Sequence, residues 1–224
     1  MKSYSRLTII GAVLLAFISC STTSDSNCEN KHIARENIEW LDIWAPHTNE
    51  SDLPRVLLLG HSITRLYGPS VDSILEGKAY VTRLATSKSL GDPAYFDEVS
   101  LILRQYDFDI IHVSNGAHGW KYSIDEYSGD LEKLYLMLKS EEPEAKLIWA
   151  TNPPMPNKKQ SMITKERNES IMKFLKGKDI LLDDTFSVLD GKAEYYEGTD
   201  GVHPNETGVK ALAEVVAGII TENI

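Results

Sequence analysis

Cysteine is scarce in this sequence of 224 residues, which contains only Cys20 and Cys28. Both lie near the N-terminus, so a disulfide between them would close a short loop in the tail and would leave the rest of the chain without a cross-link. The fold must therefore be stabilised by a buried apolar core rather than by disulfides. A chain of this length is long enough for one well-buried domain and short for two.

Basic residues are also few. The sequence holds 23 Lys and Arg against 33 Asp and Glu, which gives a formal net charge of −10 at pH 7. A strongly acidic surface repels phosphate backbones and anionic lipid head groups, so we expect no nucleic-acid partner. Internal repeats and low-complexity blocks are absent, which excludes repeat architectures. Nothing in the sequence specifies an oligomeric state.

Long apolar runs are missing as well. The stretch Leu7–Ile18 is too short to span a bilayer, but it follows two basic residues, Lys2 and Arg6, and precedes the small residue Ser19. This order is typical of a cleaved export signal. Removal of residues 1–19 takes away two positive charges and no negative ones, so the formal charge changes from −10 to −12.

The end of this stretch, Phe17-Ile18-Ser19-Cys20, resembles a bacterial lipoprotein signal, although such signals usually carry leucine where Phe17 stands. The resemblance implies cleavage before Cys20 and attachment of lipid to that residue. We then expect a periplasmic or cell-surface lipoprotein, anchored in the outer membrane, that touches the membrane only through Cys20. The alternative is an ordinary secretory signal that is cleaved nearby.

Residues 20–31 are rich in polar side chains and predict a flexible tether, followed by a single domain over 32–224. Residues 33–44 indicate a helix or an irregular flap at the domain edge. After them, short apolar runs alternate with segments of helical periodicity, which predicts a parallel sheet with helices on both faces. We expect a flavodoxin-like three-layer α/β/α sandwich with five parallel strands. The expected strands are 55–59, 79–84, 109–113, 145–150 and 179–182, and the expected helices are 64–76, 93–105, 123–140, 161–176 and 205–222.

Ser62 directly follows the apolar strand 55–59 and Gly60. In open α/β sheets, ligands bind outside the carboxyl ends of the strands, beside the positive ends of the helix dipoles. Ser62 is therefore a candidate nucleophile. Taken alone, it is equally consistent with a helix N-cap.

A second candidate is the segment Asp200-Gly201-Val202-His203-Pro204, just before the last expected helix. A hydroxyl nucleophile needs a neighbouring base, and histidine suits this role near neutral pH. The imidazole in turn needs an acceptor on its other nitrogen, which Asp200 can supply from the same turn. By itself the Asp-x-x-His pattern is weak, because it is also an ordinary turn.

Two further residues stand where strands are expected to end. Asn115 follows the strand at 109–113, and its side-chain amide can stabilise a developing oxyanion. Gly91 follows the second strand and leaves its backbone N–H approachable. The alternatives are a simple Asn-Gly turn at 115–116 and, for Gly91, the turn before a helix that Asp92 caps.

Taken in order, Gly60-His61-Ser62, Gly91, Asn115 and the 200–204 segment resemble the four sequence blocks of the SGNH hydrolase (GDSL-like esterase) family. The resemblance covers roughly residues 54–222. It implies Ser62 as nucleophile, His203 as base and Asp200 as its orienting acid. It also implies an oxyanion hole made by the N–H groups of Ser62 and Gly91 and the Asn115 side chain, with no metal or other cofactor.

The sequence departs from the family at two places. His61 stands where the family usually has aspartate, and Asn115-Gly116-Ala117-His118 replaces the commoner Gly-x-Asn-Asp. His118 is a candidate for a substrate contact or for a structural hydrogen bond. His112 lies inside an apolar run, which predicts a core residue, and no group of His, Cys and carboxylates has zinc spacing.

Aromatic residues lie close in sequence to these loops and could hold a sugar or an acyl chain, or simply fill the edge of the core. They are Tyr67, Trp120, Tyr122, Tyr195 and Tyr196. Thr151-Asn152-Pro153-Pro154 is expected to shape the rim of the site.

These features and the family resemblance predict an exported serine esterase that removes a short acyl group, expected to be acetyl, from a carbohydrate or similar polar alcohol. The alternatives are a lipase or thioesterase of the same family that acts on longer acyl chains, and a non-catalytic glycan-binding lipoprotein on the same fold.

Overall fold

The computed structural model describes residues 33–155 and 157–224. The predicted signal over 1–19, the tether over 20–31 and lipidation at Cys20 lie outside these residues and stay predictions. No helix in the described ranges is long and apolar enough to cross a membrane.

A six-stranded sheet forms the centre of the molecule, in the order β1-β3-β2-β4-β5-β6. The last five strands of this order pair in parallel, and only β1 is antiparallel to its neighbour β3. The parallel strands thus follow the flavodoxin-like order, in which the first parallel strand lies between the second and the third. The strands are β1 (Leu41–Trp44), β2 (Arg55–Gly60), β3 (Tyr80–Thr86), β4 (Ile110–Val113), β5 (Lys146–Ala150) and β6 (Leu181–Asp183).

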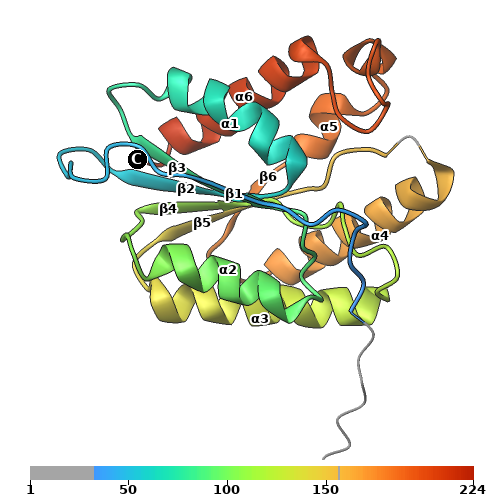
Figure 1. Ribbon diagram of the computed structural model, residues 1–224, viewed down its shortest axis with the longest axis horizontal. Coiled ribbons are helices and arrows are strands. Elements are labelled where there is room, and N and C mark those ends of the chain that lie inside the picture. Colours follow the sequence, from blue (N-terminus) through green and yellow to red (C-terminus); the bar gives the residue numbers. More distant parts are fainter. Residues whose placement is uncertain (1–32, 156) are drawn as a thin grey trace, which may run out of the picture. The chain divides into compact units, whose positions relative to one another are not determined.

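Helices cover both faces of the sheet, so the predicted three-layer sandwich is confirmed (Figure 1). Three helices lie on one face: α1 (Ser62–Ile74), α5 (Thr185–Leu189) and α6 (Glu206–Thr221). The other three lie on the opposite face: α2 (Pro93–Leu103), α3 (Ile124–Glu141) and α4 (Lys158–Leu175). The two layers bury two separate apolar clusters against the sheet.

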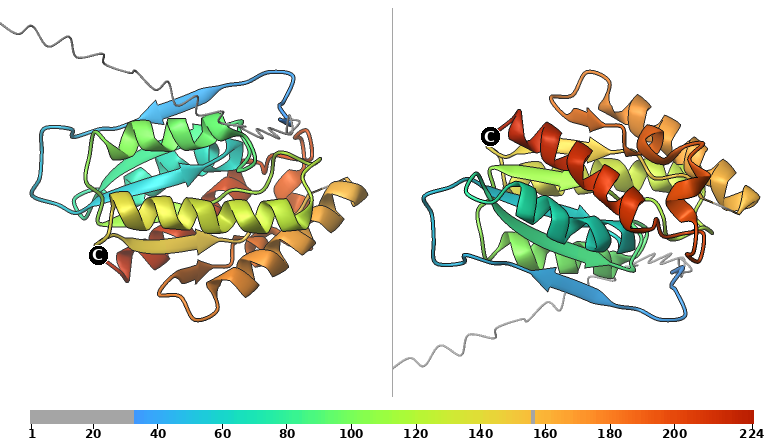
Figure 2. Two further views of the ribbon diagram at one scale, coloured as in Figure 1. Left: turned by 90° about the horizontal axis from the view of Figure 1, so that it is seen from below. Right: turned by 90° about the horizontal axis from the view of Figure 1, so that it is seen from above.

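The sixth strand is the main difference from the expected five. Residues 41–44, within the segment expected to be a helix or flap, form an extended strand on the outer edge of the sheet (Figure 2). A helix is wrong here because the backbone of Leu41 to Trp44 pairs with β3. The short helix α5 and the 3-10 helix η1 (Ala193–Tyr196) were also unexpected.

The carboxyl ends of the parallel strands bring the predicted site loops to one edge. β2 ends at Gly60, β3 at Thr86 and β4 at Val113, and these three strands are neighbours. The N–H of Ser114 still donates to Leu59 O at 2.8 Å, so the chain after β4 stays beside the end of β2. The loops that carry Ser62, Gly91 and Asn115 therefore leave the sheet on the same side.

Candidate active site

The turn from β2 to α1 is built by Gly60, His61 and Ser62. A Cβ at Gly60 would lie 2.1 Å from Thr64 Oγ1, so only glycine lets the strand enter the helix this tightly. His61 is the N-cap, and its ring accepts from Ile63 N–H at 3.4 Å. Ser62 is thus the first residue of the helix rather than its cap, and its hydroxyl is left to interact elsewhere.

His61 is a neutral imidazole with a defined tautomer. Its Nδ1 accepts from the helix, so the proton lies on Nε2, which faces Ser114 Oγ at 3.5 Å. The side chain is almost completely buried. Burial first, and then the nearby His118 and His203, lower the pKa of His61 to about 3. The ring therefore stays uncharged across the physiological pH range.

A continuous chain of hydrogen bonds joins Ser62, His203 and Asp200. The distance from Ser62 Oγ to His203 Nε2 is 2.8 Å, and the distance from His203 Nδ1 to Asp200 Oδ2 is also 2.8 Å. A carboxylate only accepts, so Nδ1 carries the proton and Nε2 is free to accept the serine proton. The structure thus brings together three residues that lie up to 141 positions apart.

Asp200 is held as a carboxylate by its own turn. Its Oδ1 accepts from the backbone N–H groups of His203 at 2.8 Å and Val202 at 2.9 Å. These bonds and the contact with the His203 ring lower the pKa of Asp200 to about 2. The side chain of Asp200 is 57% exposed, so hydrogen bonds rather than surrounding side chains hold the carboxylate in place.

The loop that carries His203 is fixed at the start of α6. Asn205 is the N-cap, and its side chain accepts from Gly208 N–H at 3.1 Å. The same side chain donates to Glu194 O at 2.7 Å, and its backbone N–H donates to Tyr195 O, also at 2.7 Å. Asn205 thus ties the loop both to α6 and to η1, two residues after His203.

Asn115 lies at the predicted edge with an unsatisfied amide. The residue is 1% exposed, and neither polar atom of its side chain makes a hydrogen bond of ordinary geometry within residues 33–155 and 157–224, although the Tyr95 hydroxyl interacts with it. Buried amides without a partner are rare, and they often belong to functional sites. Its carbonyl is fixed by the Tyr127 hydroxyl at 2.6 Å.

Gly91 is buried at the same edge and lies in the expected turn before α2, which Asp92 caps, and packing adds a second requirement at this position. A Cβ there would lie 2.5 Å from the ring of Tyr122, so the position needs glycine for space. Neither Gly91 nor Asn115 is among the residues that line the cavity beside Ser62. Their predicted part in an oxyanion hole therefore stays a prediction.

The buried side chain of Arg167 supports the loop after β4, and sequence reasoning missed it. The Arg167 guanidinium of α4 donates to the carbonyls of Gly116, His118 and Gly119 at 2.6–2.7 Å. It also lies 5.4 Å from the centre of the Trp120 ring and 4.8 Å from that of Tyr127. No carboxylate in the described part of the chain pairs with it. An arginine in a polar helical pattern reads as a surface residue, so no signal in the sequence marked it.

A cavity of about 390 Å³ opens above Ser62 and His203. Besides these two residues and their neighbours Ile63 and Val202, its wall comes from three segments, one of them the chain before β1. The lining residues from these segments are Glu36, Asn37, Ile38, Trp40, Ala117, His118, Trp120, Met155 and Gln160.

The remaining predicted residues divide between this cavity and the core. Trp120 lines the cavity, whereas Tyr67 is buried in the core with its hydroxyl near Thr64 Oγ1. His118 lines the cavity and also forms a 3.0 Å hydrogen bond with Glu36, so both of its predicted interpretations stay open. The prediction that His112 is a core residue is confirmed, because it is fully buried and bonds Asp183 at 2.8 Å.

The aromatic residues Tyr122, Tyr195 and Tyr196 lie outside this cavity. Tyr122 packs beside Gly91, and Tyr195 and Tyr196 pack against the α1–α6 layer. In the segment expected to shape the rim, Asn152 packs against Gly116. Within the described residues, no group of three His, Cys, Asp or Glu side chains is arranged to hold a metal ion.

Comparison with solved structures shows what else has this fold. The chain is similar to an acetylxylan esterase from Geobacillus stearothermophilus (18% identity, TM-score 0.61), over 75% of this chain and 94% of the other. It is also similar to a family 3 carbohydrate esterase from Talaromyces cellulolyticus (16% identity, TM-score 0.65), over 76% of this chain and 97% of the other. A third similar structure is that of a protein from Slackia heliotrinireducens assigned to the SGNH hydrolases (19% identity, TM-score 0.60), over 75% of this chain and 100% of the other. At such identities the likeness shows a shared fold. No protein-family model matches the chain, and no curated protein matches it significantly.

The contacts of Arg167 predict a stability effect. Replacing Arg167 with Met removes the side-chain donor from the carbonyls of Gly116 and His118 and leaves Gly119 O with the Tyr122 N–H alone, so it should lower the free energy of unfolding by about 1–3 kcal/mol. Urea denaturation measures this difference. Lys165→Met, at an exposed position of the same helix, is the control and should change stability by less than about 0.5 kcal/mol. Equal losses in the two variants would show that Arg167 does not support the loop.

Proposed function

We propose that this protein is a serine esterase of the SGNH type that hydrolyses an acetyl ester of a carbohydrate or similar polar alcohol. The observation that carries the proposal is the hydrogen-bonded chain from Ser62 through His203 to Asp200, at the carboxyl edge of a flavodoxin-like sheet. A hydroxyl on a free imidazole nitrogen, with a carboxylate behind the ring, is the arrangement that activates serine for acyl transfer.

In the proposed reaction, Ser62 Oγ attacks the ester carbonyl while His203 Nε2 takes its proton. The tetrahedral intermediate collapses, and His203 gives this proton to the departing alcohol oxygen, which leaves an acyl-enzyme on Ser62. Water then attacks the acyl group while His203 takes one of its protons, and His203 returns this proton to Ser62 Oγ as the acid leaves. Asp200 stays ionised throughout and stabilises the imidazolium that forms in each half of the reaction.

The oxyanion of each intermediate needs hydrogen-bond donors that are already in place. We assign this role to the Ser62 N–H, the Gly91 N–H and the Asn115 side chain. The Asn115 amide supports the assignment, because it is buried and makes no hydrogen bond of ordinary geometry within the described residues, which leaves an N–H that an oxyanion could use. Ser62 N–H belongs to the first turn of α1, where helix N–H groups have no intrahelical acceptor.

The names of the structural neighbours support an acetyl substrate, since they include an acetyl esterase, a carbohydrate esterase and an acetylxylan esterase. The cavity supports a polar alcohol, because amide, imidazole and indole side chains line it together.

The role of Ser62 as the nucleophile can be tested directly. Ser62→Ala should lower the hydrolysis of p-nitrophenyl acetate by at least about 10³-fold, since the remaining groups cannot form an acyl-enzyme. A fluorophosphonate probe should label Ser62 in the wild-type protein and leave the variant unlabelled. Ser73→Ala, at an exposed position of the same helix, serves as the control and should keep full activity. A well-folded wild-type protein that neither hydrolyses the ester nor takes up the probe would favour the non-catalytic glycan-binding alternative.

The ionisation of Asp200 leads to a prediction about pH. The lowered pKa of Asp200, about 2, means that its carboxylate is ionised at every pH above about 4. As pH falls towards 4, Asp200 should therefore add no step of its own to the decrease in kcat/KM. A slope of two on the acid side would contradict this assignment.

The substitution Asp200→Asn tests the role of the Asp200 carboxylate at constant pH. An amide can still accept from the turn N–H groups, but its NH₂ would face His203 Nδ1 and favour the tautomer with the proton on Nε2. That tautomer cannot accept the serine proton, so kcat should fall by about 10²–10⁴-fold.

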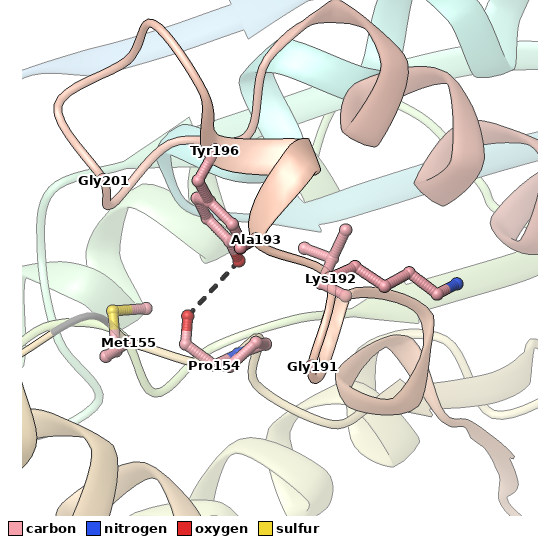
Figure 3. Close-up of a pocket in the computed structure, with 8 residues that line it drawn as sticks. Pro154, Met155, Gly191, Lys192, Ala193, Tyr196 and Gly201 are labelled. Carbon is pink, nitrogen blue, oxygen red and sulfur yellow. Dashed lines mark hydrogen bonds between the residues drawn. The ribbon is translucent and has the colours of Figure 1, made fainter.

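One observation favours the alternative of a longer acyl chain. A second cavity of about 380 Å³ lies next to the first, and Met155 lines both. Its wall is mostly apolar, and the Tyr196 hydroxyl bonds Pro154 O across it (Figure 3). An acyl chain that extends from the first cavity into the second would contact the Met155 side chain.

The position of Met155 allows a test of the acyl-chain length. The wild-type enzyme should hydrolyse p-nitrophenyl acetate at least about tenfold more efficiently than the octanoate, because an octanoyl chain that reached the second cavity would meet Met155, which lines both. Met155→Ala should raise kcat/KM for the octanoate and change that for the acetate little. A wild-type preference for the octanoate would identify the enzyme as acting on long chains.

A further inference from the structure

The chain before β1 is fixed against the body of the protein at three points. Ala34 N–H donates to the Tyr122 hydroxyl, and Arg35 Nε donates to the buried Asp92 carboxylate, both at 2.9 Å. Trp40 N–H donates to Ser87 Oγ at 2.9 Å, and Ser87 N–H returns a bond to Trp40 O at 3.1 Å. The residues between these contacts thus have a defined position.

These intervening residues reach the cavity that contains the proposed nucleophile. Glu36, Asn37, Ile38 and Trp40 form one wall of it; we call residues 36–40 the N-terminal wall. The Glu36 carboxylate bonds His118 Nδ1 at 3.0 Å, which ties this wall to the loop after β4. Ile38 is 79% exposed, which is unusual for an aliphatic side chain and places it at the mouth of the cavity.

The chemistry of this wall suits a sugar ring. Trp40 is held by the Arg65 guanidinium, which lies 5.1 Å from the centre of its ring. Trp120 lines the same cavity, with Arg167 5.4 Å from the centre of its ring. Fixed indole rings offer flat apolar faces to the C–H groups of a pyranose, and nearby amide side chains can bond its hydroxyls.

We propose that the N-terminal wall is the subsite for the alcohol part of the ester and binds a neutral saccharide ring against Trp40. The proposal rests on the proposed function of the same site. The charge of the wall also agrees with a neutral ligand. The hydrogen bond with His118 lowers the pKa of Glu36, so its carboxylate stays ionised and would repel an anionic sugar.

The test compares one sugar ester with one ester that lacks a sugar. In a pH-stat, Trp40→Ala should lower kcat/KM for xylopyranose tetraacetate by roughly tenfold, mainly through KM, and leave ethyl acetate within about twofold. Trp40→Phe should keep most of the activity on the sugar ester. Trp44→Ala is the matched control, because Trp44 is an exposed tryptophan on β1 that does not line the cavity. Equal losses on both esters, or no loss on either, would overturn the proposal.

Binding to an inactive protein separates this inference from the esterase mechanism. In the Ser62→Ala background, the Kd for acetylated xylobiose should rise roughly tenfold on Trp40→Ala and stay unchanged on Trp44→Ala. This measurement needs no catalysis, so it tests the subsite even if the wild-type protein hydrolyses neither ester. An unchanged Kd in the Trp40→Ala protein would refute the subsite, whereas absence of turnover with intact binding would refute the proposed function alone.

Discussion

The site depends on the position of β2 between β3 and β4. Val56 to Leu59 are fully buried, since helices cover the sheet on both faces, and backbone pairing fixes their register on both sides. A strand advances about 3.3 Å per residue, so a register slip of one residue would move Ser62 by more than the length of the hydrogen bond it makes. The parallel pairing therefore determines where the nucleophile stands before any side chain of the site takes part.

The position of His203 depends on a different contact. It comes from the loop before α6, and α6 packs against α1 through an apolar cluster that includes Val71 and Val216. Ser62 is the first residue of α1, and His203 lies three residues before the start of α6. The 2.8 Å bond between them thus couples the nucleophile to the helix layer on one face of the sheet. Packing of two helices and pairing of strands must both be correct for the hydrogen-bonded chain to form.

Much of this arrangement could be predicted from the sequence because it follows from short-range patterns. Apolar runs of strand length gave the five parallel strands, and the loops at their carboxyl ends had to meet at one edge. Arg167 could not be predicted, because its role depends on where α4 packs. The N-terminal wall was missed for a similar reason: residues 33–44 have no clear period, and their conformation is set by pairing with β3 and by contacts such as Arg35 with Asp92.

Gly91 shows how a residue can be noticed for one reason and required for another. The sequence suggested a glycine with an approachable N–H, whereas the structure shows that a Cβ would collide with Tyr122. The same tyrosine accepts the bond from Ala34. A single packing contact therefore links a predicted oxyanion donor to the segment that leads into the N-terminal wall, and no local pattern in the sequence contains that link.

Two histidines lie near Ser62, and their surroundings give them different roles. His203 has a carboxylate on one nitrogen and the serine on the other, so it can gain a proton without loss of a bond. His61 uses one nitrogen to cap α1 and directs the other toward Ser114, so neither nitrogen is available to Ser62. Burial keeps His61 neutral, and a neutral ring does not repel the imidazolium that His203 becomes. An N-cap needs only an acceptor, which Nδ1 supplies as an aspartate oxygen would. Histidine at this position is thus compatible with an activated serine next to it, provided that the ring remains buried.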